Sequence, residues 1–385
     1  MSSKKIVLGD SCLINYPQGA GLWILFIQYI LGLKALGHKV FFFECFTSSA
    51  DLGADEEKVR MFFERLQEYD LQDHGVVLLF EKGKAGHDIN FARSYSKRMN
   101  EVKSIIEGAD LFWNLCCAFR QPFVGMFKHS VLVDMDPGHL QVSALDVEMG
   151  IHQHHSYLTV GGKMDDGDCE APTLNLKWKP FKPFVYLPLW DVNPVDNSGR
   201  PFTTITHWNW DELDWNGRRL SLSKREAYMR YIDLPEHTKY PFEIAAYLEP
   251  DDATGDRELL QTKGWSITDP WEATSSPKDY QNYISNSRAE ISCPKPIFRE
   301  LNTGWFSDRS VCYLAAGRPV LAEDTGFSDF MPTDKGLLAF RDLEEAVAGV
   351  NEINANYQNH AKAARNLAEE VFNSEGCLKA MLDLS

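Results

Sequence analysis

Short apolar runs and amphipathic segments alternate through the first half of the chain. Runs rich in apolar residues predict strands at 5–8, 38–44, 76–80, 110–114, 130–134 and 156–160. Helical spacing of apolar residues predicts helices at 21–36, 56–69 and 91–107. Strands that alternate with helices in this way are typical of a mostly parallel sheet with helices on both faces.

The alternation stops between residues 161 and 197 and then resumes. Residues 161–197 are rich in Gly, Asp, Pro and Lys, which is typical of a linker. Beyond them, the pattern predicts strands at 202–206, 242–246, 265–268, 289–292 and 319–323. It predicts helices at 223–232, 256–262, 277–287, 307–316 and within 342–385.

We therefore expect an α/β protein of two Rossmann-like domains that face each other across a cleft. An N-terminal domain of residues 1–195, which includes the linker region 161–197, would be followed by a C-terminal domain of residues 198–370. A C-terminal helix at 371–385 would pack back on the N-terminal domain. A chain of 385 residues with 44% hydrophobic content is long enough to bury two cores, and the cleft between them is the expected place for a ligand.

Charge and composition exclude several classes of partner. The formal net charge of -16 repels phosphate backbones and anionic lipid surfaces, so broad nucleic-acid or membrane binding is not expected. The longest apolar run, 21–36, is interrupted by Gln28, Gly32 and Lys34, which predicts a buried helix and not a membrane span. Because the first residues also lack the pattern of a signal peptide, we expect a soluble cytoplasmic protein.

The cysteines and histidines do not predict a metal site. The eight cysteines include no CxxC pair and lie mostly in apolar surroundings, where a reduced thiol acts as a small hydrophobic group. The cluster 152-HQHH-155 has no carboxylate or cysteine at ligand spacing. We expect no metal and no cofactor.

The segment 304-GWFSDRSVCYLAAGRPVLAEDTGF-327 carries the main candidate site. Ser307 is a natural N-cap for a helix that ends at Gly317. One interpretation is structural: Ser307 caps, Asp308 suits the helix dipole, and Arg309 forms a surface ion pair. The other is a phosphate site, because an arginine in the first turn opposes the helix dipole unless an anion binds there.

Further polar and aromatic residues follow other predicted strands of the C-terminal domain. In 323-EDTGF-327, two carboxylates, a hydroxyl and a glycine amide would hold sugar or ribose hydroxyls, or form an ordinary turn; the residues are Glu323, Asp324, Thr325 and Gly326. Trp208 would stack on a base or a sugar, and Lys224 would pair with a phosphate. The alternative for both is surface packing.

The N-terminal domain offers candidate acid–base groups. In 134-DMDPGH-139, a predicted strand ends in Asp134 and Asp136, a Pro-Gly turn and His139. One of these three side chains would position an acceptor hydroxyl or remove its proton, and Asp10 and His152 are weaker candidates at the same edge.

Two glycines follow the first predicted strand. Gly19 and Gly21, in 15-NYPQGAGLW-23, would let the backbone approach an acceptor closely. The GxGxxG dinucleotide spacing is absent.

These residues resemble a broad, largely uncharacterised group of bacterial and phage glycosyltransferases of the GT-B type. The likeness is most specific in the segment 304–327 and extends to 132-LVDMDPGH-139, 157-YLTVGG-162, 202-FTTITHWNW-210, 264-GWSITDP-270, 287-SRAEIS-292 and 336-GLLAF-340. The resemblance implies a nucleotide-sugar donor held mainly by the C-terminal domain, an acceptor held mainly by the N-terminal domain, and no obligatory metal. The acceptor would be a small molecule or a modified nucleobase.

One departure from related enzymes concerns stereochemistry. Retaining, glycogen-synthase-like members carry two glutamates eight residues apart, at positions where this chain has Gly304 and Cys312. Retaining stereochemistry is therefore not implied, and ribose recognition would fall to Asp308 or to 323–327. Transfer of a hexosyl or pentosyl group is the leading hypothesis. The alternatives are a nucleotide-sugar epimerase or hydrolase of the same fold, and a non-catalytic nucleotide-binding protein.

Overall fold

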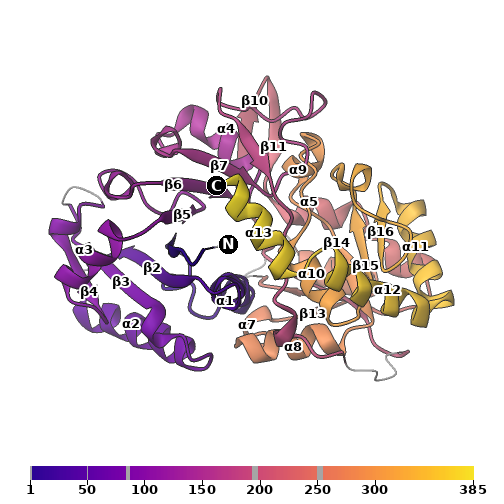
Figure 1. Cartoon of the computed structure of the whole chain (residues 1–385). Coiled ribbons are helices and arrows are strands. Elements are labelled where there is room, and N and C mark those ends of the chain that lie inside the picture. Colours follow the sequence, from indigo (N-terminus) through magenta and orange to yellow (C-terminus); the bar gives the residue numbers. More distant parts are fainter. Residues whose placement is uncertain (1, 50, 84–86, 193–197, 249–254) are drawn as a thin grey trace.

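The computed structural model describes residues 2–49, 51–83, 87–192, 198–248 and 255–385 as two α/β domains side by side (Figure 1). The predicted boundary at residue 195 and the end of the predicted linker fall within 193–197, outside the described residues. Among the described residues, no helix is both long and apolar enough to cross a bilayer.

The N-terminal domain is built on an eight-stranded sheet with the order β4-β3-β2-β1-β5-β6-β7-β8. Its strands are β1 (Lys5–Asp10), β2 (Lys39–Thr47), β3 (Gly75–Phe80), β4 (Ala92–Tyr95), β5 (Leu111–Leu115), β6 (Ser130–Asp134), β7 (Ser156–Thr159) and β8 (Trp178–Pro180). Its helices are α1 (Ala20–Ala35), α2 (Leu52–Gln67), α3 (Met99–Glu107) and α4 (His139–Asp146). All strand pairs are parallel except β3 with β4, and the central strands are almost wholly buried, as expected for strands covered on both faces.

The C-terminal domain is built on a six-stranded parallel sheet with the order β13-β12-β9-β14-β15-β16. Its strands are β9 (Phe202–Thr206), β12 (Phe242–Ala246), β13 (Trp265–Thr268), β14 (Ala289–Ser292), β15 (Val320–Glu323) and β16 (Leu337–Phe340). Its helices are α5 (Lys224–Met229), α6 (Asp256–Thr262), α7 (Pro270–Ala273), α8 (Pro277–Asn286), α9 (Pro296–Glu300), α10 (Asp308–Ala315), α11 (Leu343–Ala355) and α12 (Tyr357–Glu370).

Each sheet has a point where the strand order reverses. In the first sheet the chain moves outward from β1 to β2 and then returns to β5 on the other side of β1. In the second sheet it moves from β9 to β12 and then returns to β14. The loops separate at such points and leave a crevice at the carboxyl ends of the strands, which is where open α/β sheets bind ligands. The predicted class, with two Rossmann-like domains, is confirmed.

The structure corrects the predicted helix at 91–107. Its first part is the edge strand β4, which pairs antiparallel with β3, and α3 begins only at Met99. Ser96 has a positive φ of 69° and its hydroxyl donates to the carbonyl oxygen of Gly75, so the chain turns there. None of Ala92–Tyr95 is fully buried, which suits a strand on the edge of a sheet.

Several further elements were not predicted, among them three short strands. Strand β8 lies inside the predicted linker and extends the first sheet next to β7. A hairpin of β10 (Glu212–Trp215) and β11 (Arg218–Ser221) follows β9, and its turn residues Asn216 and Gly217 both have positive φ, as a tight hairpin turn requires.

Backbone hydrogen bonds between residues 161–170 and 301–305 join the two domains, and we call this contact the seam. The amide of Lys163 donates to the carbonyl of Thr303 at 3.0 Å, and the amide of Glu170 donates to the carbonyl of Leu301 at 2.9 Å. The Lys163 ammonium group pairs with Asp168 and with Asp329 of the other domain. The seam sets the orientation of one sheet relative to the other.

The C-terminal helix α13 (Ser374–Leu384) packs back on the N-terminal domain, as predicted (Figure 1). Leu378 and Met381 of α13 lie in the core formed around α1 and β1, and the indole of Trp113 donates to the hydroxyl of Ser385 at 2.9 Å. A Cβ at Gly32 of α1 would lie only 2.5 Å from a methyl carbon of Leu378. Because glycine has no side chain, α1 and α13 can pack closely at Gly32.

We predict that Gly32→Val lowers the free energy of unfolding by about 1–3 kcal/mol, the usual cost of overpacking a core. Urea denaturation would measure the change. Gly376→Val, on the exposed side of α13, is the matched control, because a Cβ there has no contact closer than 3.4 Å. Equal destabilisation by the two variants would show that α1 and α13 do not need close packing.

Candidate active site

A cavity of about 450 Å³ lies between the domains, at the carboxyl ends of the strands of both sheets. From the N-terminal domain, the loop after β1, the start of α1 and the turn after β6 line it. From the C-terminal domain, segments after β9, β12, β13 and β14 and the first turn of α10 line it. Both points of strand-order reversal therefore open into one cavity.

Three basic side chains meet in this cavity, from the starts of α5, α9 and α10: Lys224, Lys295 and Arg309. The ammonium nitrogen of Lys224 lies 5.9 Å from the centre of the Trp305 ring, and within the described chain it has no hydrogen bond or ion pair. Burial, and then the positive charges of Arg309 and Lys295, lower the pKa of Lys224 to about 7. Lys224 thus forms no direct ion pair within the described chain, although the nearby carboxylates of Asp308 and Glu290 favour its charged form.

Arg309, in contrast, is paired inside the protein. Its Nε donates to Glu290 at 2.6 Å, while its two terminal nitrogens donate to the carbonyl of Ile205 at 2.7 Å and to the hydroxyl of Ser292 at 3.1 Å. The expectation that Arg309 needs an external anion is therefore wrong, because the buried carboxylate of Glu290 in β14 supplies one. Arg309 joins the carboxyl ends of β9 and β14 and still lines the cavity.

The start of α10 matches its prediction. The Ser307 hydroxyl accepts a hydrogen bond from the amide of Arg309 at 3.2 Å, and the chain leaves the helix through Gly317, which has a φ of 68°. Ser307 and Asp308 both line the cavity, so the first turn of α10 faces it. Burial raises the pKa of Asp308, although Arg309 and Lys224 oppose the change.

The turn after β6 brings Asp136 and His139 to the cavity, opposite Lys295 of the other domain. One carboxylate oxygen of Asp136 lies 2.8 Å from the Lys295 ammonium, and the other lies 3.8 Å from Nδ1 of His139. Withdrawal from water would raise the pKa of Asp136, but Lys295 and His139 outweigh it and hold that pKa well below its usual range. Asp136 is therefore a carboxylate near neutral pH.

Asp134 is not among the residues that line the cavity. Its buried carboxyl group accepts hydrogen bonds from Gln141 at 2.9 Å, from Thr159 at 2.8 Å and from the amide of Asp136 at 2.9 Å. Burial raises its pKa to about 6 despite these bonds. Asp134 holds the shape of the turn that presents Asp136 and His139.

Trp208 also lies away from the lining of the cavity. It is buried, stacks on Tyr228 with ring centres 6.2 Å apart, and donates to Asp256 through its indole nitrogen. The exposed aromatic ring on this loop is that of Trp210.

The residues predicted at 323–326 lie outside the cavity lining as well. Glu323 accepts hydrogen bonds from Arg230 and Tyr231, and Asp324 forms an ion pair with Arg341 at 2.7 Å. The Thr325 hydroxyl donates to a backbone carbonyl. Glu323 ends β15, the strand beyond β14 in the sheet order, so the loop that follows is displaced from the point of reversal.

The two N-terminal glycines, Gly19 and Gly21, do line the cavity. A Cβ at Gly21 would lie 3.3 Å from the ring of Tyr280 in α8. The glycine therefore allows α1 to approach the C-terminal domain closely.

The sequence analysis did not identify Lys295 or a group of four aromatic residues that line the cavity. Tyr16, Trp210 and Tyr247 line the cavity with 48%, 49% and 41% of their surface exposed, and Trp271 lies beside Tyr247 with ring centres 6.5 Å apart. Each follows a strand of one of the two sheets. The signal available in the sequence was an aromatic or basic residue shortly after a strand-like run, as in 293-CPKP-296.

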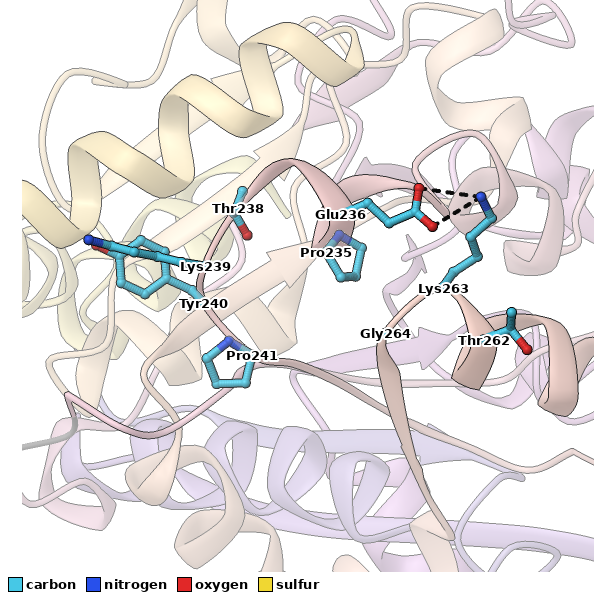
Figure 2. A pocket seen from close by; sticks show the side chains of 9 residues that line it. All are labelled: Pro235, Glu236, Thr238, Lys239, Tyr240, Pro241, Thr262, Lys263 and Gly264. Carbon is cyan, nitrogen blue, oxygen red and sulfur yellow. Dashed lines mark hydrogen bonds and ion pairs between the residues drawn. The ribbon is translucent and has the colours of Figure 1, made fainter.

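A second cavity, of about 430 Å³, lies on the C-terminal domain alone (Figure 2). Figure 2 shows Glu236 and Lys263 paired across its rim. Pro241 and Gly264 line it and immediately precede β12 and β13, so this cavity lies at the amino ends of those strands. That is the opposite edge of the sheet from the active-site candidate.

The residues that the structure describes include no group of three or more His, Cys, Asp or Glu side chains arranged to hold a metal ion. Independence from metal stays a prediction.

Comparisons with known proteins identify the fold. No family model matches the sequence. No curated protein matches it either. Among solved structures, HepE of Anabaena in complex with UDP-glucose is 13% identical, with 99% of this chain and 98% of that chain covered and a TM-score of 0.61.

Two other solved structures are also similar over nearly their full length. An alpha-glucosyltransferase in complex with UDP and DNA is 9% identical, with 99% of each chain covered and a TM-score of 0.58. Sucrose-phosphate synthase from Thermosynechococcus elongatus is 11% identical, with 99% of this chain and 98% of that chain covered and a TM-score of 0.55. At these identities the likeness shows the fold, which is the GT-B arrangement of two Rossmann-like domains.

Proposed function

We propose that the protein is a glycosyltransferase that moves a hexosyl or pentosyl group from a nucleoside-diphosphate sugar to an acceptor hydroxyl. The observation that carries the proposal is the convergence of Lys224, Lys295 and Arg309 with the first turn of α10 in the interdomain cavity. The full-length likeness to structures solved with UDP or UDP-glucose supports it. We also propose a reducing, cytoplasmic location, in keeping with eight free cysteines.

The diphosphate would bind at Lys224. Lys295 already faces Asp136, and Arg309 already faces Glu290, so Lys224 is the cation of the three with charge to offer a ligand. The Ser307 hydroxyl and the first turn of α10 would add a hydrogen-bond donor and the positive end of the helix dipole. We propose that these groups, and no metal ion, stabilise the leaving nucleoside diphosphate.

The nucleobase would lie beside Tyr247 and Trp271. These rings follow β12 and β13, which are the first and second strands away from β9 in the sheet order. Both rings line the same cavity as Lys224, so a nucleoside diphosphate bound at Lys224 would place its base toward them. A base would stack on an exposed aromatic ring.

The acceptor would bind against the N-terminal wall formed by Gly19, Gly21 and the turn after β6. Asp136, held as a carboxylate by Lys295, would accept a hydrogen bond from the acceptor hydroxyl and orient that hydroxyl toward the sugar. His139 lies next to Asp136 and would share this role. Asp134 would act through the turn and not on the substrate.

We predict that Lys224→Met weakens binding of UDP by about 10–100-fold, because it removes a charge-assisted contact worth about 1.5–3 kcal/mol. Isothermal titration calorimetry near pH 6.5 measures the effect, and the exposed Lys335→Met serves as the control. Affinity of the wild type should fall as the pH rises above 7, because Lys224 then loses its proton. Unchanged UDP affinity in Lys224→Met would contradict this donor site.

We predict that Asp136→Asn slows sugar transfer by about 10²–10⁴-fold and leaves UDP affinity within a few-fold of the wild type. The measurement is release of nucleoside diphosphate from a panel of nucleotide sugars, with and without hydroxyl acceptors. The exposed Asp334→Asn, away from the cavity and from the interdomain contact, is the matched control. Full activity in Asp136→Asn would remove this residue from the mechanism, and release that ignores every acceptor would indicate a hydrolase.

A further inference from the structure

Two acidic side chains are buried together beneath the N-terminal wall of the cavity. Asp10 ends β1 and pairs in register with Glu44 of the parallel strand β2, so the two side chains project from the same face of the sheet. Both residues have 0% of their surface exposed. Neither takes part in the donor or acceptor contacts proposed above.

Both carboxyl groups hold the same loop. One oxygen of Asp10 accepts a hydrogen bond from the amide of Cys12 at 2.8 Å, and one oxygen of Glu44 accepts from the amide of Ile14 at 3.1 Å. The carbonyl of Cys12 in turn accepts from the amide of Tyr16 at 2.8 Å. Cys12 and Tyr16 line the cavity, so the pair of acids supports this wall from below.

The remaining oxygen of each acid, Oδ1 of Asp10 and Oε2 of Glu44, is buried and accepts no hydrogen bond from the described residues. A single proton held between the two groups would give both oxygens a partner. Two adjacent carboxylates without that proton would repel each other in a place that water does not reach.

The ionisable groups around the pair do not supply a counter-ion. The thiols of Cys12 and Cys45 face it, and burial in the first place raises the pKa of each, so that both stay neutral. The thiol of Cys116 lies on the same side, on an exposed residue. Burial also raises the pKa of Asp10 to about 6 and that of Glu44 well above its usual value. No lysine, arginine or histidine among the described residues forms an ion pair with Asp10 or Glu44, and no cation is among the groups that shift their pKa values.

We propose that Asp10 and Glu44 share one proton, and that this proton positions residues 11–19, the wall against which the acceptor binds. The assignment of that wall to an acceptor rests on the proposed function, whereas the shared proton does not. Asp10 and Glu44 are positioning residues in this scheme, because they reach the cavity only through the loop. Loss of the proton leaves two carboxylates that repel each other, and the bonds to Cys12 and Ile14 loosen.

The direction of the pH effect follows from the pKa shifts. The folded protein holds the proton more tightly than the unfolded chain does, since burial raises the pKa of both acids. Residues 11–19 are therefore fully ordered at low pH, and this order is lost as the pH rises through the pKa that the pair has in the folded protein.

Hydrogen–deuterium exchange of residues 11–19 in the full-length protein, without donor or acceptor, tests the proposal. Between pH 6 and pH 9, after correction for the intrinsic exchange rate, we expect protection of the wild-type loop to fall by about ten-fold, or about 1.4 kcal/mol. Asp10→Asn should keep its protection across this range, because its amide group accepts from Cys12 and donates permanently to Glu44. Asp10→Ala, which does neither, should lose protection at both pH values.

Two results would overturn the proposal: an equal pH dependence in Asp10→Asn and the wild type, or loss of protection in Asp10→Asn as large as in Asp10→Ala. If Asp10→Asn does not fold, infrared difference spectra between the same pH values are compared for the wild type and Asp134→Asn, since the band of the pair must persist in Asp134→Asn, where the other buried acid of similar pKa is gone. Absence of that band would also overturn the proposal. Binding of UDP is measured separately and tests the proposed function. Failure of the shared-proton proposal therefore does not imply failure of the proposed function, and the reverse also holds.

Discussion

The contact between residues 161–170 and 301–305 is the constraint on which the cavity depends. Its backbone hydrogen bonds, together with the buried ammonium group of Lys163, hold the two sheets with their carboxyl ends toward each other. Trp305 belongs to this seam: it pairs with Gly161, donates to the carbonyl of Met135 through its indole, and presents its ring to Lys224. The same residue therefore fixes the domains and lines the site.

Of the three basic side chains in the cavity, Lys295 and Arg309 form direct ion pairs within the described chain and Lys224 does not. Asp136 faces Lys295 across the two domains, and Glu290 faces Arg309 within the C-terminal domain. Lys224 lies among these groups, where withdrawal from water lowers its pKa and so destabilises its positive charge in the absence of a bound anion. A diphosphate would relieve that cost, which gives a physical reason for the site to prefer an anionic ligand despite the net charge of -16 on the whole chain.

Sequence reasoning succeeded where a residue's role depends on its neighbours along the chain. Continuous apolar runs identified the buried parallel strands, and Ser307 was recognised as a cap from its place before a helix. It failed where the role depends on contacts far along the chain, since nothing near Arg309 in sequence shows that Glu290 neutralises it. The edge strand β4 and the hairpin of β10 and β11 were missed for a related reason, because half-exposed strands lack a continuous apolar run.

The central claim is that Lys224, which is only partly protonated at pH 7 in the free protein, binds a phosphate group of the donor. Calorimetry of UDP binding in buffers with different ionisation enthalpies counts the protons taken up by the complex. With a pKa of about 7 in the free protein, Lys224 should take up roughly half a proton when UDP binds at pH 7, and the uptake should vanish in Lys224→Met. Binding of UDP without proton uptake, or with the same uptake in the variant, would contradict the account.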